Sequence, residues 1–245
     1  MLSLKHGYRA AVIGATGAIG GAVARRLQAD PRAGEVMRFG RSASDADFRI
    51  DLESEPSIRA AAARAGAVDL LFVATGALRL TAKGGPPEGK AFEPEKALAR
   101  LDPQALAAQF AVNAIGPALV LKHFAKNQPR GDRALAAVLS ARVGSIGDNR
   151  LGGWHGYRAA KAALNQYVRT IAIELRRTHP KLVLAALHPG TVESPLSAPF
   201  RPEGAARPDI LTPENSAAAL LRVLDSLADR QSGGFYDYRG RAIEW

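Results

Sequence analysis

The chain has 245 residues, of which 47% are hydrophobic and 23% are charged, a balance typical of one globular α/β domain. It has no cysteine, which excludes disulfides and thiolate chemistry, and its five histidines lack the spacing of a metal site, so no metal is expected. The formal net charge of +10 comes mostly from scattered arginines without a basic stripe, so we expect no specific nucleic-acid function.

Targeting and membrane signals are weak in this sequence. No apolar run approaches the length of a membrane span, and the stretch before the first predicted strand is too short and polar for a signal peptide. We therefore expect a cytoplasmic protein without membrane contact. Because neither a linker nor a repeat divides the sequence, residues 1–245 are predicted to form one domain.

The first predicted element is a short buried strand that ends in closely spaced glycines. The apolar residues Ala10 to Ile13 are followed by Gly14, Gly17 and Gly20, and then by helical spacing. Glycines allow a sharp turn close to a pyrophosphate, and the N–H groups that open the helix attract an anion. The turn is therefore predicted to be a dinucleotide site, with an ordinary strand-to-helix turn as the alternative.

The second predicted strand, Glu35 to Phe39, is followed by an arginine. In a dinucleotide fold, an acid at this tip binds the free ribose 2′-hydroxyl, whereas an arginine accommodates a 2′-phosphate. Arg41 stands at the tip, and the first acid after it is Asp45. NADP(H) is therefore the preferred cofactor and NAD(H) the second choice, unless Arg41 is simply a solvated loop residue.

Further strands and a helix follow in the middle of the chain. Residues 48–50 are predicted to be a short strand, and 69–74 are an apolar run typical of a central parallel strand. The Gly/Pro-rich stretch 79–95 is predicted to be a loop near the site or a solvated insertion. A helix is expected to begin at Pro103, and it places Asn113 among apolar neighbours, where the amide needs partners or has a role in the site.

A tyrosine and a lysine follow the fifth predicted strand, residues 134–139. Ser140 and Ser145 lie on the loop that follows this strand. Tyr157 and Lys161 stand one turn apart at the start of a long predicted helix. An ammonium beside a phenol lowers the phenol pKa from about 10. Tyr157 is thus predicted to act as an acid or base near neutral pH, although such a pair alone is usually a helix surface.

The last third of the chain supplies one more wall of the predicted site. The sixth strand, 182–187, is followed by a Pro-Gly turn at 188–191 that would hold backbone against a ligand. Residues 194–209 are proline-rich and are predicted to be a lid. A final helix is expected to start at Thr212, before a last strand and tail at 235–245.

These motifs resemble the short-chain dehydrogenase/reductase family along essentially the whole chain. The resemblance rests on the glycine turn, VATG at 73–76, Asn113, YRAAK at 157–161 and HPGTV at 188–192. SARVGSIGDNRLGGW at 140–154 resembles the C-factor branch, named for a developmental cell–cell signalling protein. The family implies an α/β, single-domain, Rossmann-like doubly wound fold with a seven-stranded parallel sheet, and NAD(P)(H) as cofactor.

The resemblance also implies roles for individual residues. Tyr157 would protonate the substrate oxygen as hydride reaches the carbonyl carbon, Lys161 would bind the nicotinamide ribose and lower the tyrosine pKa, and Asn113 would support a proton relay through water. The expected catalytic residues are Tyr157, Lys161, Ser140 and Asn113. The expected cofactor-binding residues are Gly14, Thr16, Gly17, Ile19, Gly20, Arg41, Asp51, Leu52, Ala74, Thr75, Gly76, Asn113, Tyr157, Lys161, Pro189, Gly190 and Val192.

Two positions depart from the family pattern. Ala18 stands where the middle glycine is usual, so the phosphate turn is expected to differ in detail. Ala141 stands where the family has the serine that orients the carbonyl, so Ser140 or, with less support, Ser145 would take that role.

The leading function is an NADP(H)-dependent carbonyl reductase or alcohol dehydrogenase for a small molecule. The first alternative is a cofactor-binding signalling or regulatory protein of C-factor type with little turnover. An extended-family epimerase fits the glycine spacing but lacks the longer C-terminal domain of such enzymes. The resemblance further implies a homodimer or homotetramer formed through helices near 103–127 and 157–178.

Overall fold

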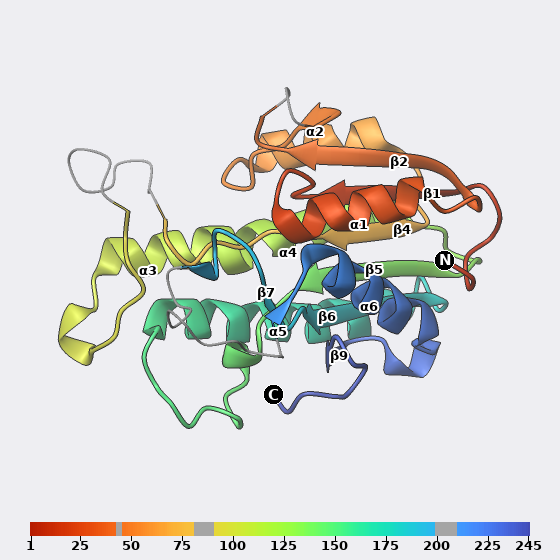
Figure 1. Cartoon of the computed structure of the whole chain (residues 1–245). Coiled ribbons are helices and arrows are strands. Elements are labelled where there is room, and N and C mark those ends of the chain that lie inside the picture. Colours follow the sequence, from red (N-terminus) through yellow and green to blue (C-terminus); the bar gives the residue numbers. More distant parts are fainter. Residues whose placement is uncertain (43–45, 81–90, 199–209) are drawn as a thin grey trace.

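The computed structural model describes residues 1–42, 46–80, 91–198 and 210–245. Its centre is a seven-stranded sheet in the order β3-β2-β1-β4-β5-β6-β9, in which every neighbouring pair is parallel (Figure 1). The strands are β1 Tyr8–Ile13, β2 Ala33–Gly40, β3 Phe48–Arg49, β4 Leu70–Val73, β5 Ala134–Leu139, β6 Leu182–His188 and β9 Gly234–Asp237. The predicted doubly wound sheet is confirmed, and the strand order reverses between β1 and β4.

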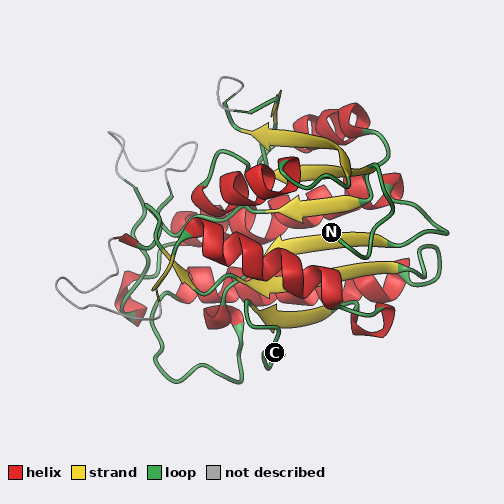
Figure 2. Ribbon diagram, turned by 45° about the vertical axis from the view of Figure 1, so that its right-hand side comes forward, coloured by secondary structure: helices red, strands yellow, loops and turns green. Residues whose placement is uncertain are grey.

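Helices cover both faces of this sheet (Figure 2). The two faces form separate apolar clusters: Ala11 and Ile13 of β1 belong to one, Ala10 and Val12 to the other. On the first face lie α2 Glu55–Ala65, α4 Gly116–Phe124 and α5 His155–Leu175, and on the second α1 Ala18–Gln28 and α6 Pro213–Ser226. Because both faces are covered, the central strands are apolar at nearly every position instead of alternating.

Local capping fixes where two of the helices begin. Asp102 accepts a hydrogen bond from the Ala105 N–H at 2.8 Å, and α3 Pro103–Phe110 starts directly after it. Thr212 caps α6 in the same way, through the Asn215 N–H at 3.1 Å. A side-chain oxygen that satisfies a free N–H, followed by a proline that has none, is a strong start signal. Both predicted starts are confirmed.

The helix that begins at Pro103 is not regular throughout. One π turn, Ala111–Ile115, separates α3 from α4, and a 3₁₀ turn, Ala125–Asn127, ends the run. By length and composition alone, Pro103–Asn127 is apolar enough to cross a membrane, so the prediction that no apolar run approaches a span is wrong. Its apolar character has a local reason, since Val120 and Phe124 pack in the core.

Short elements connect the layers. Three further 3₁₀ turns of the described residues lie at Leu98–Arg100, Arg142–Gly144 and Asp229–Gln231. Strand β7 Thr191–Val192 pairs in parallel with β8 Ile210–Leu211. Leu80 and Phe92 form an isolated antiparallel bridge at the two ends of the predicted 79–95 loop. Residues 81–90 of that loop and 199–209 of the predicted lid lie outside the described residues.

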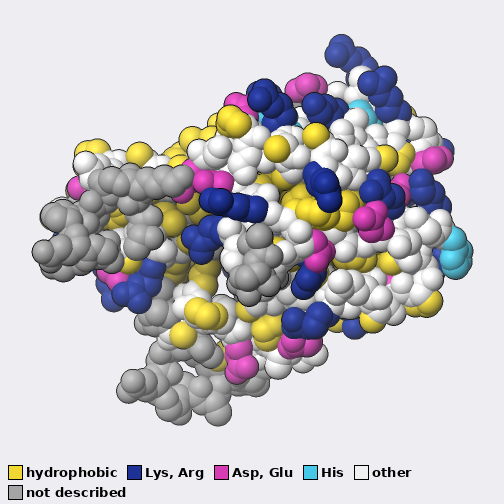
Figure 3. All heavy atoms as spheres, turned by 90° about the horizontal axis from the view of Figure 1, so that it is seen from above, with side chains coloured by type: hydrophobic (Ala, Val, Ile, Leu, Met, Phe, Trp, Pro, Cys, Tyr) yellow, Lys and Arg dark blue, Asp and Glu magenta, His cyan; other side chains and the backbone are white. Residues whose placement is uncertain are grey.

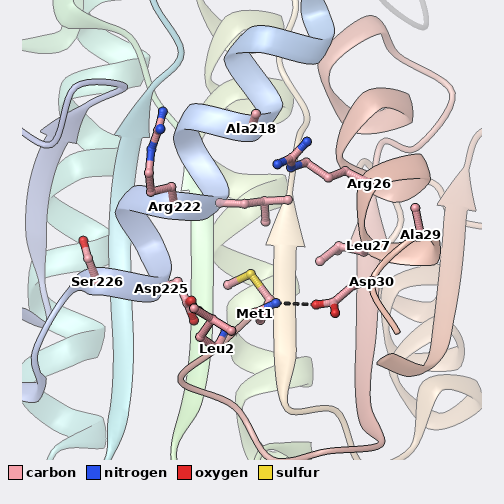
Figure 4. Close-up of a pocket in the computed structure, with 11 residues that line it drawn as sticks. Met1, Leu2, Arg26, Leu27, Ala29, Asp30, Ala218, Arg222, Asp225 and Ser226 are labelled. Atoms are coloured by element: carbon pink, nitrogen blue, oxygen red, sulfur yellow. Dashed lines mark hydrogen bonds and ion pairs between the residues drawn. The ribbon is translucent and has the colours of Figure 1, made fainter. Parts of the chain in front are cut away.

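On the face shown in Figure 3, lysine and arginine side chains are spread among acidic ones. A hollow of about 580 Å³ lies between the C-terminal ends of α1 and α6, and Figure 4 shows residues that line it. There the Met1 ammonium pairs with Asp30, and Arg26 stands in the last turn of α1, where the helix dipole favours a cation. The hollow therefore lies near the amino ends of the strands, on the side where the chain leaves α1 for β2 and α6 for β9.

Candidate active site

A cavity of about 670 Å³ opens at the carboxyl ends of the strands, where the strand order reverses between β1 and β4. Ligands of doubly wound sheets bind in the crevice at this position. The predicted site residues in its wall are Thr16, Gly17, Ile19, Arg41, Ala74, Thr75, Gly76, Ser140, Tyr157, Lys161, Pro189, Gly190 and Val192. The fold thus brings segments from β1 to β7 to one place.

The glycine turn after β1 depends on two glycines beneath the wall. Gly14 has a φ of +84°, and a Cβ on Gly20 would lie 2.1 Å from the Gly14 carbonyl oxygen, closer than any real contact. Gly17 precedes α1, and no side chain caps its first N–H groups. Gly14 and Gly20 therefore allow the tight backbone turn without lining the cavity, whereas Gly17 and Ala18 line it.

Arg41 lines the cavity from the tip of β2. The nearby Arg38 is already paired, since its guanidinium lies 2.7 Å from an Asp47 carboxylate oxygen. Within the described part of the chain, Arg41 makes no hydrogen bond or ion pair. It is therefore available for an anionic group, as the sequence predicts; Asp45 lies outside the described residues.

Asp51 and Leu52 lie outside the cavity wall. The Asp51 carboxylate accepts a hydrogen bond from the Glu53 N–H at 3.0 Å. Leu52 packs against the start of α4, where a Cβ on Gly116 would lie 2.9 Å from the Leu52 Cβ. Their contacts with a cofactor stay predictions.

Tyr157 and Lys161 lie together in the first two turns of α5. Both are buried, with 8% and 2% of their surfaces exposed. The Lys161 Nζ lies 5.8 Å from the centre of the Tyr157 ring and donates a hydrogen bond to the Leu139 carbonyl at 2.9 Å, at the end of β5. The pair is thus fixed at the cavity wall by the helix and by the sheet.

Burial dominates the electrostatics of this pair. It raises the pKa of the Tyr157 hydroxyl and lowers the pKa of Lys161 to about 7. The predicted lowering of the phenol pKa is therefore not observed. The reason is that desolvation disfavours the phenolate and the ammonium alike.

Asn113 lies at the centre of the π turn and is fully buried. Its Nδ2 donates to the Ala77 carbonyl and to Gln109 Oε1, both at 2.8 Å, and its Oδ1 accepts from the Ala77 N–H at 3.0 Å. A Cβ on Gly76 would lie 3.2 Å from both Asn113 Oδ1 and Lys161 Nζ. Asn113 thus holds the backbone after β4 beside Lys161, and its part in a proton relay stays a prediction.

The serine position departs from the family pattern in three dimensions as well. Ser140 borders the cavity, but its Oγ donates to Asn165 Oδ1 at 2.7 Å. Ser145 is buried outside the wall and accepts from the Asp148 N–H at 3.1 Å. Ala141 faces the cavity with a methyl group. The orienting role of Ser140 therefore stays a prediction, and its only hydroxyl proton is engaged elsewhere.

The wall also contains residues that were not among the predicted ones, and Arg142, Trp154 and His188 are the largest polar or aromatic side chains of this group. The Arg142 guanidinium lies 3.0 Å from Asp148 and 3.5 Å from Asp237. Burial lowers the pKa of His188 to about 4, so its ring is neutral at pH 7. Arg142 and His188 lie at or just after the carboxyl ends of predicted strands. Because ligands of doubly wound sheets bind at these ends, both residues could have been predicted from the sequence. No local sequence signal marks Trp154.

The wall suits an anionic dinucleotide. Among the described residues, its charged side chains are Arg41, Arg142 and Lys161, with no carboxylate. Thr75 Oγ1 is buried at this wall without a partner among the described residues, so it has a hydrogen bond to offer. The described residues contain no cluster of three His, Cys, Asp or Glu side chains that would hold a metal ion.

Comparisons with known proteins agree with this geometry. The sequence model of the short chain dehydrogenase family matches residues 9–204. The chain is 34% identical over 149 residues to the C-signal of Myxococcus xanthus, which covers 61% of this chain and 84% of that protein. It is 29% identical over 200 residues to the 1-hydroxy-2-glutathionyl-2-methyl-3-butene dehydrogenase of a Rhodococcus species, covering 80% and 78% of the two chains.

A solved structure shows the same architecture over almost the whole length. It is a short-chain dehydrogenase/reductase from Burkholderia multivorans with bound NADP, with a TM-score of 0.77 and 25% identity, covering 97% of this chain and 99% of that one. The family match, the sheet order and the Tyr157–Lys161 pair at the cavity wall lead to one conclusion. This chain belongs to the short-chain dehydrogenase/reductase family.

Proposed function

We propose that the protein is an NADP(H)-dependent oxidoreductase that transfers hydride between the nicotinamide and a carbonyl or alcohol group of a small molecule. The observation that carries the proposal is the buried Tyr157–Lys161 pair in the wall of a cavity at the carboxyl ends of the strands. A buried acid beside a cation, in a cleft of this size, is a candidate for proton transfer.

The residues of the wall fit the cofactor along its length. The glycine turn and the first N–H groups of α1 would hold the pyrophosphate, and Arg41 would hold the 2′-phosphate. Pro189, Gly190 and Val192 would face the nicotinamide end from the segment after β6. When bound, the cofactor supplies or accepts the hydride. The NADP-bound Burkholderia structure supports this assignment.

The protein's own residues would handle the proton. The Tyr157 hydroxyl, whose pKa burial raises further above neutrality, is protonated at pH 7 and would give its proton to the substrate oxygen during reduction. Lys161, whose pKa burial lowers to about 7, is partly protonated at neutral pH, and in its ammonium form it would stabilise the phenolate that this step leaves. The apolar surroundings exclude water, which strengthens both interactions. Asn113 keeps the backbone beside Lys161 in place.

A second function, cofactor binding for signalling with little turnover, has one specific observation in its favour. The methyl group of Ala141 and the Ser140–Asn165 hydrogen bond leave no free serine hydroxyl at the position where the family orients a carbonyl. The likeness to the C-signal points in the same direction. The likeness to the Rhodococcus dehydrogenase favours turnover instead.

Assembly through the outer helices is also part of the proposal. Ile115 in the π turn, and Tyr167 and Ile173 on α5, are large apolar or aromatic side chains exposed to solvent. Such side chains on neighbouring helices favour a contact with a second copy. We expect a homodimer or homotetramer by size-exclusion chromatography with light scattering.

The two functions are separated by Tyr157→Phe, with Tyr167→Phe, an exposed tyrosine of the same helix, as the matched control. We expect Tyr157→Phe to lose about 10³-fold in NADPH-dependent reduction of an aldehyde and ketone panel, because the phenol supplies the proton. NADPH affinity, measured by fluorescence titration, should change less than about threefold.

Full turnover in Tyr157→Phe would contradict the catalytic role of the phenol. A wild-type protein that binds NADPH without reducing any member of the panel would favour the signalling function.

A further inference from the structure

The residue that begins helix α5 provides no side-chain acceptor for the first backbone N–H groups of the helix. Its N-cap residue, Trp154, has a φ of +51° and makes no capping hydrogen bond with its side chain. The indole has a donor and no acceptor, and the first N–H groups of any helix need acceptors. A left-handed backbone is unfavourable for a bulky residue, so neighbouring contacts must hold it.

A residue from a distant segment supplies these contacts. The backbone carbonyl of Glu95 accepts the Trp154 N–H at 2.5 Å, and its carboxylate Oε2 accepts the Gly156 N–H at 3.2 Å. The side chain is buried, with 5% of the Glu95 surface exposed. A carboxylate at a helix N-terminus is also stabilised by the helix dipole. Glu95 therefore caps α5 from outside the helix.

The glycine at position 156 makes room for this cap. A Cβ there would lie 2.9 Å from Glu95 Oε1 and 3.0 Å from a Leu106 methyl carbon. Within the described residues, Glu95 Oε1 has no hydrogen-bond partner. A glycine in a helix and an unpaired buried oxygen are both destabilising. Both unfavourable features, Gly156 and the unpartnered Glu95 Oε1, occur at the helix turn that carries Tyr157.

The same turn is held from its other side by Arg158, whose Nε donates to the Gly153 carbonyl at 2.9 Å. Next to the hydrogen bonds of Glu95 and Arg158, the Trp154 ring stands edge-on to the Tyr157 ring, with centroids 6.5 Å apart and an interplanar angle of 80°. The position of the phenol therefore depends on the hydrogen bonds that fix the helix start.

We propose that Glu95 is a positioning residue for Tyr157: by capping α5 it fixes the left-handed Trp154 and the phenol that follows against the cavity. The inference rests on the proposed role of Tyr157. Without the cap, the first turn frays and the hydroxyl moves away from the substrate oxygen. A displacement of about 1 Å at a reacting group costs on the order of 10²-fold in rate.

The test compares Glu95→Ala and Glu95→Gln with Glu93→Ala, an exposed carboxylate paired with Arg79. We expect Glu95→Ala to lower kcat about 30- to 100-fold, with the KM and the NADPH dissociation constant changed by less than about threefold. Glu95→Gln keeps an acceptor oxygen and should stay within about threefold of wild type, as should Glu93→Ala.

Two readouts do not need turnover. The Gly156 amide should exchange its hydrogen faster in Glu95→Ala but not in Glu95→Gln, because only the first loses the acceptor. In a Trp245→Phe background, Trp154 is the single tryptophan, and its emission should shift to the red in Glu95→Ala. A wild-type protein without turnover would refute the proposed function, while these two readouts would still decide whether Glu95 holds the turn.

Three results would overturn the inference: an unchanged kcat in Glu95→Ala, unchanged exchange at Gly156, or a loss of kcat matched by an equal loss of NADPH affinity. If Glu95→Ala does not fold, Gly156→Ala decides, since its methyl group must displace the carboxylate. A kcat in Gly156→Ala equal to wild type would overturn the proposal, and a fall comparable with that expected for Glu95→Ala would support it.

Discussion

Removing the Ser140 hydroxyl separates a structural contact from a catalytic one. Ser140 Oγ donates to Asn165 Oδ1 at 2.7 Å, and both residues are buried. Asn165 Nδ2 already has no partner among the described residues, so Ser140→Ala would leave the whole amide without one. An unpaired buried polar group costs about 1–3 kcal/mol. We expect the free energy of unfolding to fall by that amount, which lowers Tm by about 2–4 °C per kcal/mol in a chain of this size.

Urea unfolding and thermal melting measure this loss, and kcat with NADPH measures any catalytic part. We expect kcat to stay within about threefold of wild type, because the hydroxyl proton is engaged by Asn165. Adding Asn165→Leu should return part of the lost stability, since removing both polar partners is nearly neutral when the shape is kept. The double-mutant cycle then gives the coupling between the two side chains.

The opposite result has a definite structural meaning. If the Asn165 amide is rotated by 180°, its Nδ2 becomes the donor, and the Ser140 proton is free for a substrate oxygen. Ser140→Ala would then lower kcat by about 10²-fold or more. Such a loss would refute the structural role and establish Ser140 as the residue that orients the substrate.

Three further predictions concern the cofactor and pH. Arg41→Ala should raise the NADPH dissociation constant by about 10- to 100-fold and leave that of NADH nearly unchanged in fluorescence titrations, because only NADPH carries the 2′-phosphate; equal losses would contradict this. Gly20→Ala should abolish binding of both nucleotides, because its Cβ would meet the Gly14 carbonyl oxygen at 2.1 Å; retained binding would refute the role of the turn. Burial lowers the His188 pKa from 6.5 to about 4, so on acidification the unfolded chain takes up this proton before the folded one. Stability should therefore fall between these two pH values, by about 3 kcal/mol in urea unfolding, and a His188→Gln variant that falls as steeply would refute the assignment.

Local rules on the sequence determined a large part of this protein. The glycine turn, the caps at Asp102 and Thr212, and the spacing of Tyr157 and Lys161 each depend on residues within about one or two helical turns of one another. The apolar run at 69–74 predicted a central parallel strand, and the family resemblance added the doubly wound arrangement and the seven strands. All of these elements are present in the structure.

The tertiary structure decided what distant segments do to one another. The π turn around Asn113 exists where its amide reaches back to the backbone after β4, and no periodicity in the helix announces it. The direction of the Ser140 hydroxyl follows from Asn165, twenty-five positions later. The cap of α5 comes from Glu95, sixty-one positions before the amide of Gly156. Sequence spacing fixes which side chains share a strand or a helix face, but hydrogen-bond partners and pKa shifts arise from burial against other elements, which only the packed chain defines.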